Sequence, residues 1–592
     1  MEKEAMRGAS FLLHDSQYED VFTPEAFSEE QMMMGKMTSD FVAQEVVPVL
    51  DEIEAHQFEH SVKLMKKAGE LGLVGANIPE RYGGVGLDKI SATIIQENFA
   101  RARSFALTYG AHVGIGTLPL VFFGNEEQKK KYLPSLAIGD SVASYALTEP
   151  TSGSDALSAK TVAKRSECGQ YFLLTGEKQW ITNSAFSDVF IVYAKVDGKD
   201  FTAFIVERDY PGVSTGPEEK KMGIKGSSTR TLLLDDVKVP VENVLGEIGK
   251  GHVIAFNILN VGRFSLAAGC VGSAKRAIDL SIQYAKQRQQ FDTPISSFTL
   301  IQNKMANMLI QTYVAESMVY RTAGLIEQNL GHISEEVKSD GRAIGDAIAE
   351  YAIECSINKV FASEVLDQVI DEAVQIYGGY GFMNEYEVEN IYRDSRINRI
   401  FEGTNEINRL LIPATLTRKV MKGELDLIST GERLQEELMM LMPVNLEGKM
   451  MNRIKHYTQM MKKLFLMVAG TAMKKYGPAL EQEQELLAHV ADIVIHIFAL
   501  ESAMLRAENA IHRLGEDKAS LMLNMTDVYA HETMQALELK AKECISAMEE
   551  GDERRTMFSI VRKLTRTHQL DTIALKRKIA HKVIEAEGYI TY

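Results

Sequence analysis

The chain has 592 residues, of which 45% are hydrophobic and 25% charged, the composition of a globular protein too long for one hydrophobic core. We expect three or four domains. The 81 acidic residues outnumber the 65 basic ones. The net charge of −16 argues against a nucleic-acid partner, because that binding relies on Lys and Arg to neutralise phosphates.

The cysteines and the N-terminus bear on location. The four cysteines lie far apart without a CxxC pair, which favours a reducing compartment and no metal site. The N-terminus lacks an apolar signal core, and no run approaches the ~18 apolar residues that a membrane span needs. The longest apolar run, IVIHIFAL (493–500), is interrupted by His496 and predicts a buried helix. We expect a bacterial cytoplasmic protein, with a trimmed organellar protein as the alternative.

Residues 1–144 are predicted to form an N-terminal helical domain. A helix in MKKAGELGLVGANIP (65–79) stops at a glycine, and RYGGVGL (81–87) is a glycine loop. The run NEEQKKKYLPSLAIGD (125–140) begins with Asn125 and early acids, as a helix does.

Residues 145–251 are predicted to form a β domain. The runs YFLLTGEKQWIT, DVFIVYAKV, FTAFIVERD and TRTLLLDDVKVP are short and rich in β-branched and aromatic residues, with Gly, Asp and Ser between them. This spacing is typical of a small sandwich or barrel. No long helix follows any of these strands, so we do not expect a βαβ nucleotide fold.

Helices return in residues 252–425 and continue in a C-terminal extension, residues 426–592. Gly477-Pro478 breaks the extension. Its Met-rich, amphipathic segments GERLQEELMMLMP and MMNRIKHYTQMMKKLFLMVAG favour either contact with a membrane surface or a helical domain packed on the core. The predicted fold is mainly α with a central β domain. Apolar stripes support these helices: Val271, Ala274, Ile278, Ile282 and Ala285, then Ile454, Tyr457, Met461 and Leu464.

Three segments are candidates for chemistry, and each has a simpler interpretation. The loop YALTEPTSGSD (145–155) can lay backbone N–H groups and hydroxyls against a polar ligand, or it is a plain turn. The segment QWIT (179–182) holds the only tryptophan, which could be a core residue. The glycines of QIYGGYGF (375–382) lack a preceding strand, so they are no dinucleotide fingerprint and could end a helix.

Glu402 stands out in RIFEGTNEI (399–407) because its neighbours are Ile400, Phe401 and Gly403. An apolar pocket disfavours the charged carboxylate and raises its pKa, as a general base for a weakly acidic proton requires. The alternative is an ordinary capping acid.

The order of these motifs resembles that of the acyl-CoA dehydrogenase family over roughly residues 40 to 420. The chain is similar to the very-long-chain branch in its NVGR segment (260–263) and its helical extension. The resemblance implies a helical domain, a β-barrel or sandwich domain and a four-helix bundle, with FAD bound between domains and across a homodimer. The matching segments are IPERYGGVGL, YALTEPTSGSD, GEKQWITNS, KMGIKGSSTR, NVGRFSLAAG, RQQFDTPISSF, QIYGGYGF and RIFEGTNEI.

The family forms a trans-2 double bond in an acyl-CoA thioester, and the resemblance makes Glu402 the base that removes the α proton. Some members place the base at the position of Gly262, where glycine cannot serve. The backbone N–H of the base helps to polarise the thioester carbonyl, and Gly403 allows close approach. Glu406 is the competing acid: it either contacts FAD or pairs with Arg409.

The resemblance also implies the binding residues. One departure is Asp292, where the family usually has glycine, and an acid there could repel the FAD pyrophosphate. Arg263 is expected to face the nucleotide end of CoA, although a lone helix arginine is otherwise usually on the surface. The implied FAD contacts are Tyr145, Leu147, Thr148, Ser154, Trp180, Thr182, Thr404 and Glu406. The implied contacts to the FAD of a second subunit are Arg288, Phe291, Gln302, Gln375 and Gly379. The implied CoA contacts are Ser154, Phe256, Asn260, Arg263 and Gly403.

We therefore expect an FAD-dependent dehydrogenase of long, straight acyl-CoA thioesters in fatty-acid β-oxidation, with electron-transferring flavoprotein as its electron acceptor. An acyl-CoA oxidase that uses O₂ is one alternative. A non-catalytic assembly protein of the same fold is another.

Overall fold

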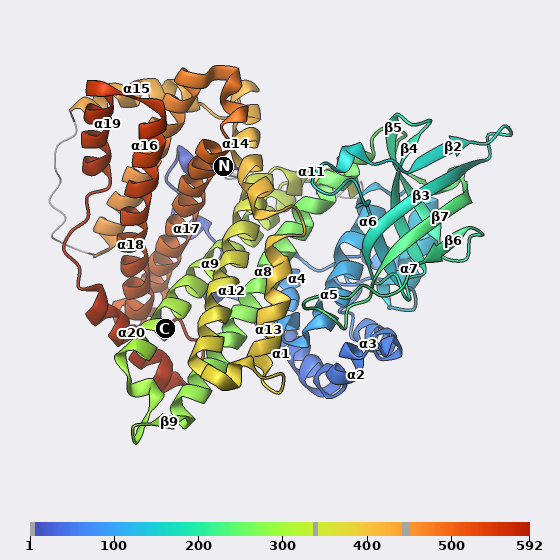
Figure 1. The fold of residues 1–592 in the computed structure, drawn as a ribbon, viewed down its shortest axis with the longest axis horizontal. Helices are drawn as coiled ribbons and strands as arrows, with labels where there is room; N and C mark the ends of the chain where they lie inside the picture. The colour runs from blue at the N-terminus through green and yellow to red at the C-terminus, as the bar shows by residue number, and fades with distance from the viewer. Residues whose placement is uncertain (1–5, 335–340, 441–449) are drawn as a thin grey trace.

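The computed structural model describes residues 6–334, 341–440 and 450–592. A β domain lies at one side of the molecule, a bundle of long helices lies in the middle, and the helices of the C-terminal extension lie at the other side (Figure 1). The expected mainly α fold with a central β domain is confirmed.

The N-terminal helices carry the predicted caps. Asn125 and Gln128 form a reciprocal capping box at the start of α7, which confirms the expected helix N-terminus. A π-helical turn, His112–Gly116, separates α5 from α6. The helices are α1 (Glu29–Phe41), α2 (Leu50–Glu54), α3 (Phe58–Glu70), α4 (Lys89–Asn98), α5 (Ser104–Ala111), α6 (Leu118–Phe123) and α7 (Glu126–Ala137).

The β domain is an eight-stranded sheet in the order β6-β7-β3-β2-β4-β5-β8, with β1 parallel to β4. Alternate residues of β4 face opposite sides: Phe190 packs with Phe172 inside the domain, whereas Ile191 packs with Leu133 of α7. The predicted strands are confirmed. They are β1 (Ala143–Ala146), β2 (Val162–Arg165), β3 (Tyr171–Thr182), β4 (Val189–Val196), β5 (Asp200–Glu207), β6 (Val213–Thr215), β7 (Thr229–Pro240) and β8 (Val244–Leu245).

The bundle is built on α8, a helix of 37 residues. A two-stranded hairpin of β9 (Gln289–Gln290) and β10 (Thr293–Pro294) separates α8 from α9. The stripe predicted from Val271 to Ala285 is buried. The helices are α8 (Gly251–Gln287), α9 (Thr299–Gly331), α11 (Gly341–Ala349), α12 (Ala352–Tyr377), α13 (Glu387–Ser395) and α14 (Asn405–Met421).

The extension packs on the bundle through α17, α18 and α20. The second predicted stripe, Ile454 to Leu464, is fully buried on α16, which packs on α17 and α18. The run 493–500 is a buried part of α17, as expected. The end of the segment GERLQEELMMLMP, residues 441–443, lies outside the described residues. The helices are α15 (Leu427–Met439), α16 (Met450–Tyr476), α17 (Gln484–Leu514), α18 (Glu516–Met548), α19 (Gly551–Leu564) and α20 (Thr572–Ala586).

The first described residues pack on the extension. Buried Arg321 on α9 donates to Ser16 Oγ at 2.8 Å and to Glu501 Oε2 on α17 at 2.6 Å. Buried Arg506 on α17 bonds to Glu25 Oε1 at 2.6 Å. Buried cations need carboxylate partners, and the N-terminal segment supplies one of them.

In the described parts of the chain, three helical segments are long and apolar enough to cross a membrane. This corrects the expectation that no run approaches that length. The segments are Ser104–Phe123, Gly251–Gln287 and Gln484–Leu514. In each, 61 to 72% of the most apolar window is buried inside the protein. Their apolar residues therefore serve the core described above.

Candidate active site

The loop that carries Glu402 crosses α8 at Gly262. Glu402 and Gly403 have φ values of +56° and +79°, so two successive residues are left-handed, a conformation that costs a non-glycine residue about 1 kcal/mol. A Cβ atom at Gly262 would lie 2.5 Å from Glu402 Oε2. The carboxylate therefore occupies the space that this glycine leaves on the helix.

Side chains from three helices hold the carbonyl groups of this loop. Glu402 O accepts from Arg263 Nε at 3.1 Å and from Asn408 Nδ2 at 3.3 Å. Gly403 O accepts from Lys359 Nζ at 2.7 Å and from Asn408 Nδ2 at 2.8 Å. In the described parts of the chain, the Glu402 N–H has no acceptor. The loop thus keeps its carbonyls occupied and one donor free.

Glu402 is placed as a general base requires. Burial raises the pKa of its carboxyl to about 7, against the opposing effect of Arg263 and then Lys359. Its Oε2 has no hydrogen-bond partner among the described residues. The carboxylate can therefore accept a proton near neutral pH.

Arg263 is buried, so the simpler interpretation of a surface arginine is wrong. Its Nη1 donates to Asn260 Oδ1 at 3.0 Å. The guanidinium supports the Glu402 loop, and its expected contact with the nucleotide end of CoA stays a prediction. Asn260 is buried beside it, and Phe256 is exposed one turn earlier on α8.

The simpler interpretation of Glu406 is an ion pair with Arg409. Glu406 lies in the first turn of α14, whereas Arg409 bonds to Glu364 Oε1 and Asp492 Oδ1, each at 2.7 Å. The expected Glu406–Arg409 ion pair is therefore wrong. Thr404 caps α14 by accepting from the Ile407 N–H at 3.2 Å.

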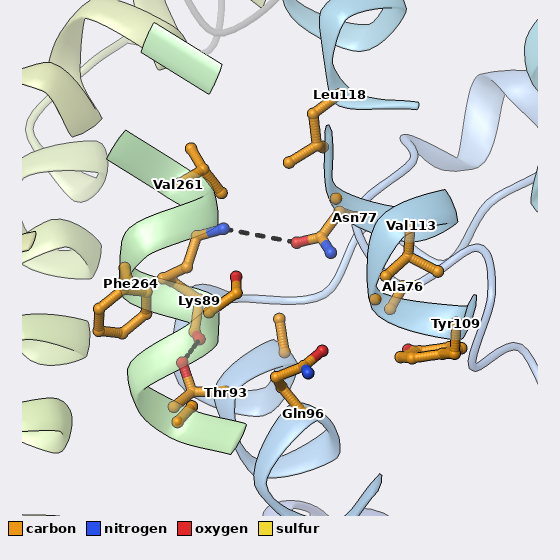
Figure 2. Close-up of a pocket in the computed structure, with 15 residues that line it drawn as sticks. Ala76, Asn77, Lys89, Thr93, Gln96, Tyr109, Val113, Leu118, Val261 and Phe264 are labelled. Atoms are coloured by element: carbon orange, nitrogen blue, oxygen red, sulfur yellow. Dashed lines mark hydrogen bonds between the residues drawn. The ribbon is translucent and has the colours of Figure 1, made fainter. Parts of the chain in front are cut away.

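A small cavity lies between α4, α5, the π-turn and α8 (Figure 2). Its lining includes Val261, the neighbour of Gly262 on α8. One wall comes from α8, with Val261, Phe264 and Ala268. The facing side chains of α4 are Lys89, Thr93 and Gln96, and Lys89 Nζ lies 3.5 Å from Asn77 Oδ1.

Trp180 lies on the β domain with 58% of its surface exposed, so the core interpretation is wrong. The β3–β7 pairing shifts register between Lys178 and Ile181, and Trp180 has a φ of +58° there. The bulge turns an indole outward from a strand that ends at Thr182. An exposed aromatic face of this kind fits a planar ring system.

The loop after β1 is built around a buried ion pair that the motifs did not predict. Lys178 Nζ bonds to Glu149 Oε1 at 2.6 Å, and Glu149 also accepts from the Lys160 and Thr161 N–H groups. This pair holds the segment with Leu147, Thr148 and Ser154 beside β3. Tyr145 packs edge-on against Tyr193, with ring centroids 5.3 Å apart.

The remaining candidates gather elsewhere, at the end of the bundle with β9, away from β3 (Figure 1). Arg288 lies over the Tyr380 ring at 5.6 Å, which joins the hairpin to the turn after α12. Phe291 is 90% exposed, and it and Asp292 have φ values of +54° and +57°. Asp adopts this conformation more readily than most residues, so it can replace glycine in this turn. Gln302 is buried nearby, Gln375 lies in the last turn of α12, and Gly379 lies in the turn that follows.

Lys359 and Asn408 were missed from the sequence because no motif marks them. The sequence around Lys359, INKVFASEV (357–365), mixes apolar and polar residues and does not single the lysine out.

Comparisons with known proteins identify the family of this chain. Residues 28–140, 144–237, 249–417 and 460–563 match the N-terminal, the middle and two C-terminal domains described for acyl-CoA dehydrogenases. The chain is 59% identical over 586 residues to a probable acyl-CoA dehydrogenase of Bacillus subtilis, with 99% of both chains covered. It is 37% identical over 470 residues to the human mitochondrial very long-chain specific acyl-CoA dehydrogenase, covering 75% of this chain and 69% of that relative.

A crystal structure of an acyl-CoA dehydrogenase complexed with FAD, from Bacillus anthracis, superposes with a TM-score of 0.98. It has 60% identity and covers 99% of this chain and 100% of that chain. These matches confirm the resemblance read from the order of the motifs. This chain belongs to the acyl-CoA dehydrogenase family.

Proposed function

We propose that this protein binds FAD and dehydrogenates acyl-CoA thioesters between the α and β carbons. The observation that carries the proposal is Glu402, a buried carboxylate with a pKa of about 7 and an oxygen that has no hydrogen-bond partner among the described residues. Long, straight acyl chains, electron-transferring flavoprotein as the acceptor, a homodimer and a cytoplasmic location are the finer parts of the proposal.

The residues present fit FAD. The exposed Trp180 offers a flat face for the flavin ring, and a Cβ at Gly153 would meet no atom within 4 Å, which leaves room beside the loop after β1. Tyr145, Leu147, Thr148, Ser154 and Thr182 would hold the group together with Trp180. Bound FAD supplies the acceptor for the hydride that leaves the β carbon.

The residues of this chain perform the rest of the reaction. The acyl chain lies in the cavity along α4 and α8, which excludes water from the reacting carbons. Glu402 takes the α proton as the charge moves towards the thioester oxygen. The free Glu402 N–H stabilises that oxygen. Arg263 and Asn408 keep the loop in place during the transfer.

Long acyl chains are part of the proposal because the protein is similar to the very-long-chain branch of the family. The match to the human very long-chain enzyme extends over 75% of this chain, and the helical extension supports the same branch. The apolar stripe of α16 is buried inside the extension, and the extension packs on the bundle through α17, α18 and α20, so we favour a packed domain over a membrane-binding one.

The first test is an anaerobic titration with palmitoyl-CoA, watching the visible flavin band in the wild type and in Glu402→Gln. The wild type is expected to bleach, while the variant binds ligand and stays yellow. If the purified protein lacks flavin, the assembly-protein alternative replaces this proposal. If both proteins bleach alike, the base is another residue.

The electron acceptor needs its own assay. During turnover in air, an oxidase releases one H₂O₂ per acyl-CoA, whereas a dehydrogenase that depends on a flavoprotein acceptor releases little. Stoichiometric peroxide would reject electron-transferring flavoprotein as the acceptor.

A further inference from the structure

Lys359 on α12 is a fully buried cation next to the Glu402 loop. Its Nζ donates to Gly403 O and to Asn405 Oδ1, both at 2.7 Å. Among the described ion pairs, none joins Lys359 to a carboxylate within 4.0 Å. Burying an ammonium group costs several kcal/mol unless its surroundings compensate, so this lysine needs an explanation.

The acceptors of Lys359 are themselves held in place. Asn405, the first residue of α14, donates to Ser363 Oγ at 3.1 Å and to Glu364 Oε1 at 3.0 Å. The ammonium thus ties the carbonyl of Gly403 to the start of α14 and to α12. Because Gly403 directly follows Glu402, this tie restrains the backbone of the base.

The charges around the site come from several elements. Lys359 faces Glu402 on its loop, Glu406 on α14, and Arg263 and Cys270 on α8. Arg263 holds the Glu402 carbonyl from the α8 side. Two cations therefore flank one buried carboxylate. Each favours the ionised form that accepts a proton, against the effect of burial.

We propose that Lys359 is a positioning residue for the base: its ammonium group holds the Gly403 carbonyl, keeps Glu402 in its left-handed conformation and stabilises the Glu402 carboxylate. The role rests on the proposed function, because it assigns Lys359 to the same reaction.

The proposal has a consequence for pH. Burial lowers the pKa of Lys359 to about 8, so the ammonium form is lost above that pH. The rate of flavin bleaching should rise as Glu402 ionises near pH 7 and fall as Lys359 loses its proton.

The test measures the anaerobic bleaching rate at saturating palmitoyl-CoA between pH 5.5 and 9.5 in the wild type, Lys359→Met and Lys359→Gln. In both variants the rising limb should move about one pH unit higher and the falling limb should disappear, because an opposite charge at this range shifts a pKa by one unit or more. Lys359→Gln keeps a donor for Gly403 and should have the higher maximal rate of the two.

A second readout needs no turnover. The infrared carboxylate band that is absent in Glu402→Gln should titrate at a higher pH in Lys359→Gln than in the wild type. The control is Lys462→Met, which removes a buried lysine that bonds to Glu501 on α17. It should lower the melting temperature without moving the pH profile.

The outcomes separate the two claims. A wild type that does not bleach contradicts the proposed function. If the wild type bleaches and both Lys359 variants show the same pH profile and the same infrared titration as the wild type, the role of Lys359 alone is overturned.

Discussion

At the residue scale, the site depends on Glu402, whose burial and left-handed backbone both cost free energy. Glu402 is buried, left-handed and close to two cations, and its carboxylate fills the space above Gly262. Such strain persists where the surrounding structure holds it, as Arg263, Asn408 and Lys359 do here. The residue is therefore optimised for proton transfer rather than for stability.

The Gly262→Ala variant tests this close approach. The new methyl group would meet Glu402 Oε2 at 2.5 Å and displace the carboxylate, and a displacement of about 1 Å can lower the rate about 100-fold. Alanine is the better helix former by about 1 kcal/mol, so stability should not fall. Bleaching rate and melting temperature are measured together. Gly470→Ala is the control, because a Cβ there meets no atom within 4 Å. An active Gly262→Ala enzyme would contradict the placement of Glu402.

The raised pKa of Glu402 also predicts a pH-dependent stability. Its pKa is 4.5 before burial and about 7 in the folded protein, so the folded state binds the proton more tightly. That contribution to stability is present below pH 4.5 and is lost as the pH rises through 7. Glu402→Gln cannot ionise, so it should be more stable than the wild type by about 3 kcal/mol at pH 8 and nearly equal at pH 4. Thermal unfolding at the two pH values checks this. If the stability difference between Glu402→Gln and the wild type is the same at pH 4 and pH 8, Glu402 is not the group that titrates.

At the element scale, the N-terminal segment and the extension depend on each other. Arg506 on α17 bonds to Glu25 Oε1 and to Glu316 Oε2 on α9, each at 2.6 Å. Tyr589, near the C-terminus, donates to Glu316 Oε2 at 2.8 Å. Segments nearly 500 residues apart therefore share one buried ionic cluster. The extension cannot pack normally without the N-terminal segment that supplies Glu25.

Glu25→Ala should destabilise the protein by about 3 kcal/mol, because it leaves a buried arginine short of one partner. The melting temperature, read by circular dichroism, is the measurement. Asp552→Ala removes an acid from an exposed pair with Arg555 and should change little. Equal effects of the two substitutions would mean that the cluster contributes no more than a surface pair.

At the scale of the whole molecule, aromatic side chains remain exposed at the β9 end of the bundle. Phe291 and Phe382 are 90% and 84% exposed, and Tyr380 lies beside Arg288. Large exposed aromatic groups in one region are typical of an interface. This surface also carries the residues expected to contact the FAD of a second subunit.

Phe382→Asp should therefore shift the protein from dimer to monomer and lower its flavin content. Sedimentation and the ratio of visible to ultraviolet absorbance measure the two effects. Leu539→Asp, which changes an exposed apolar residue on α18, is the control and should leave both unchanged. If the Phe382→Asp variant remains a dimer with full flavin content, this surface is not the dimer interface.

The sequence by itself determined much of this protein. Period-two and period-3.6 patterns located the strands and long helices, because burial of one face imposes those periods, and the cap at Asn125 located a helix start. The apolar neighbours of Glu402 indicated a base, because residues adjacent in the chain remain near one another in any fold.

Only the tertiary structure decided the rest. Arg263, Lys359 and Gly262 lie 40 to 140 residues from Glu402 in the sequence, and only the packing of α8 and α12 against its loop brings them together. The outward turn of Trp180 required a bulge between two strands, which composition does not reveal.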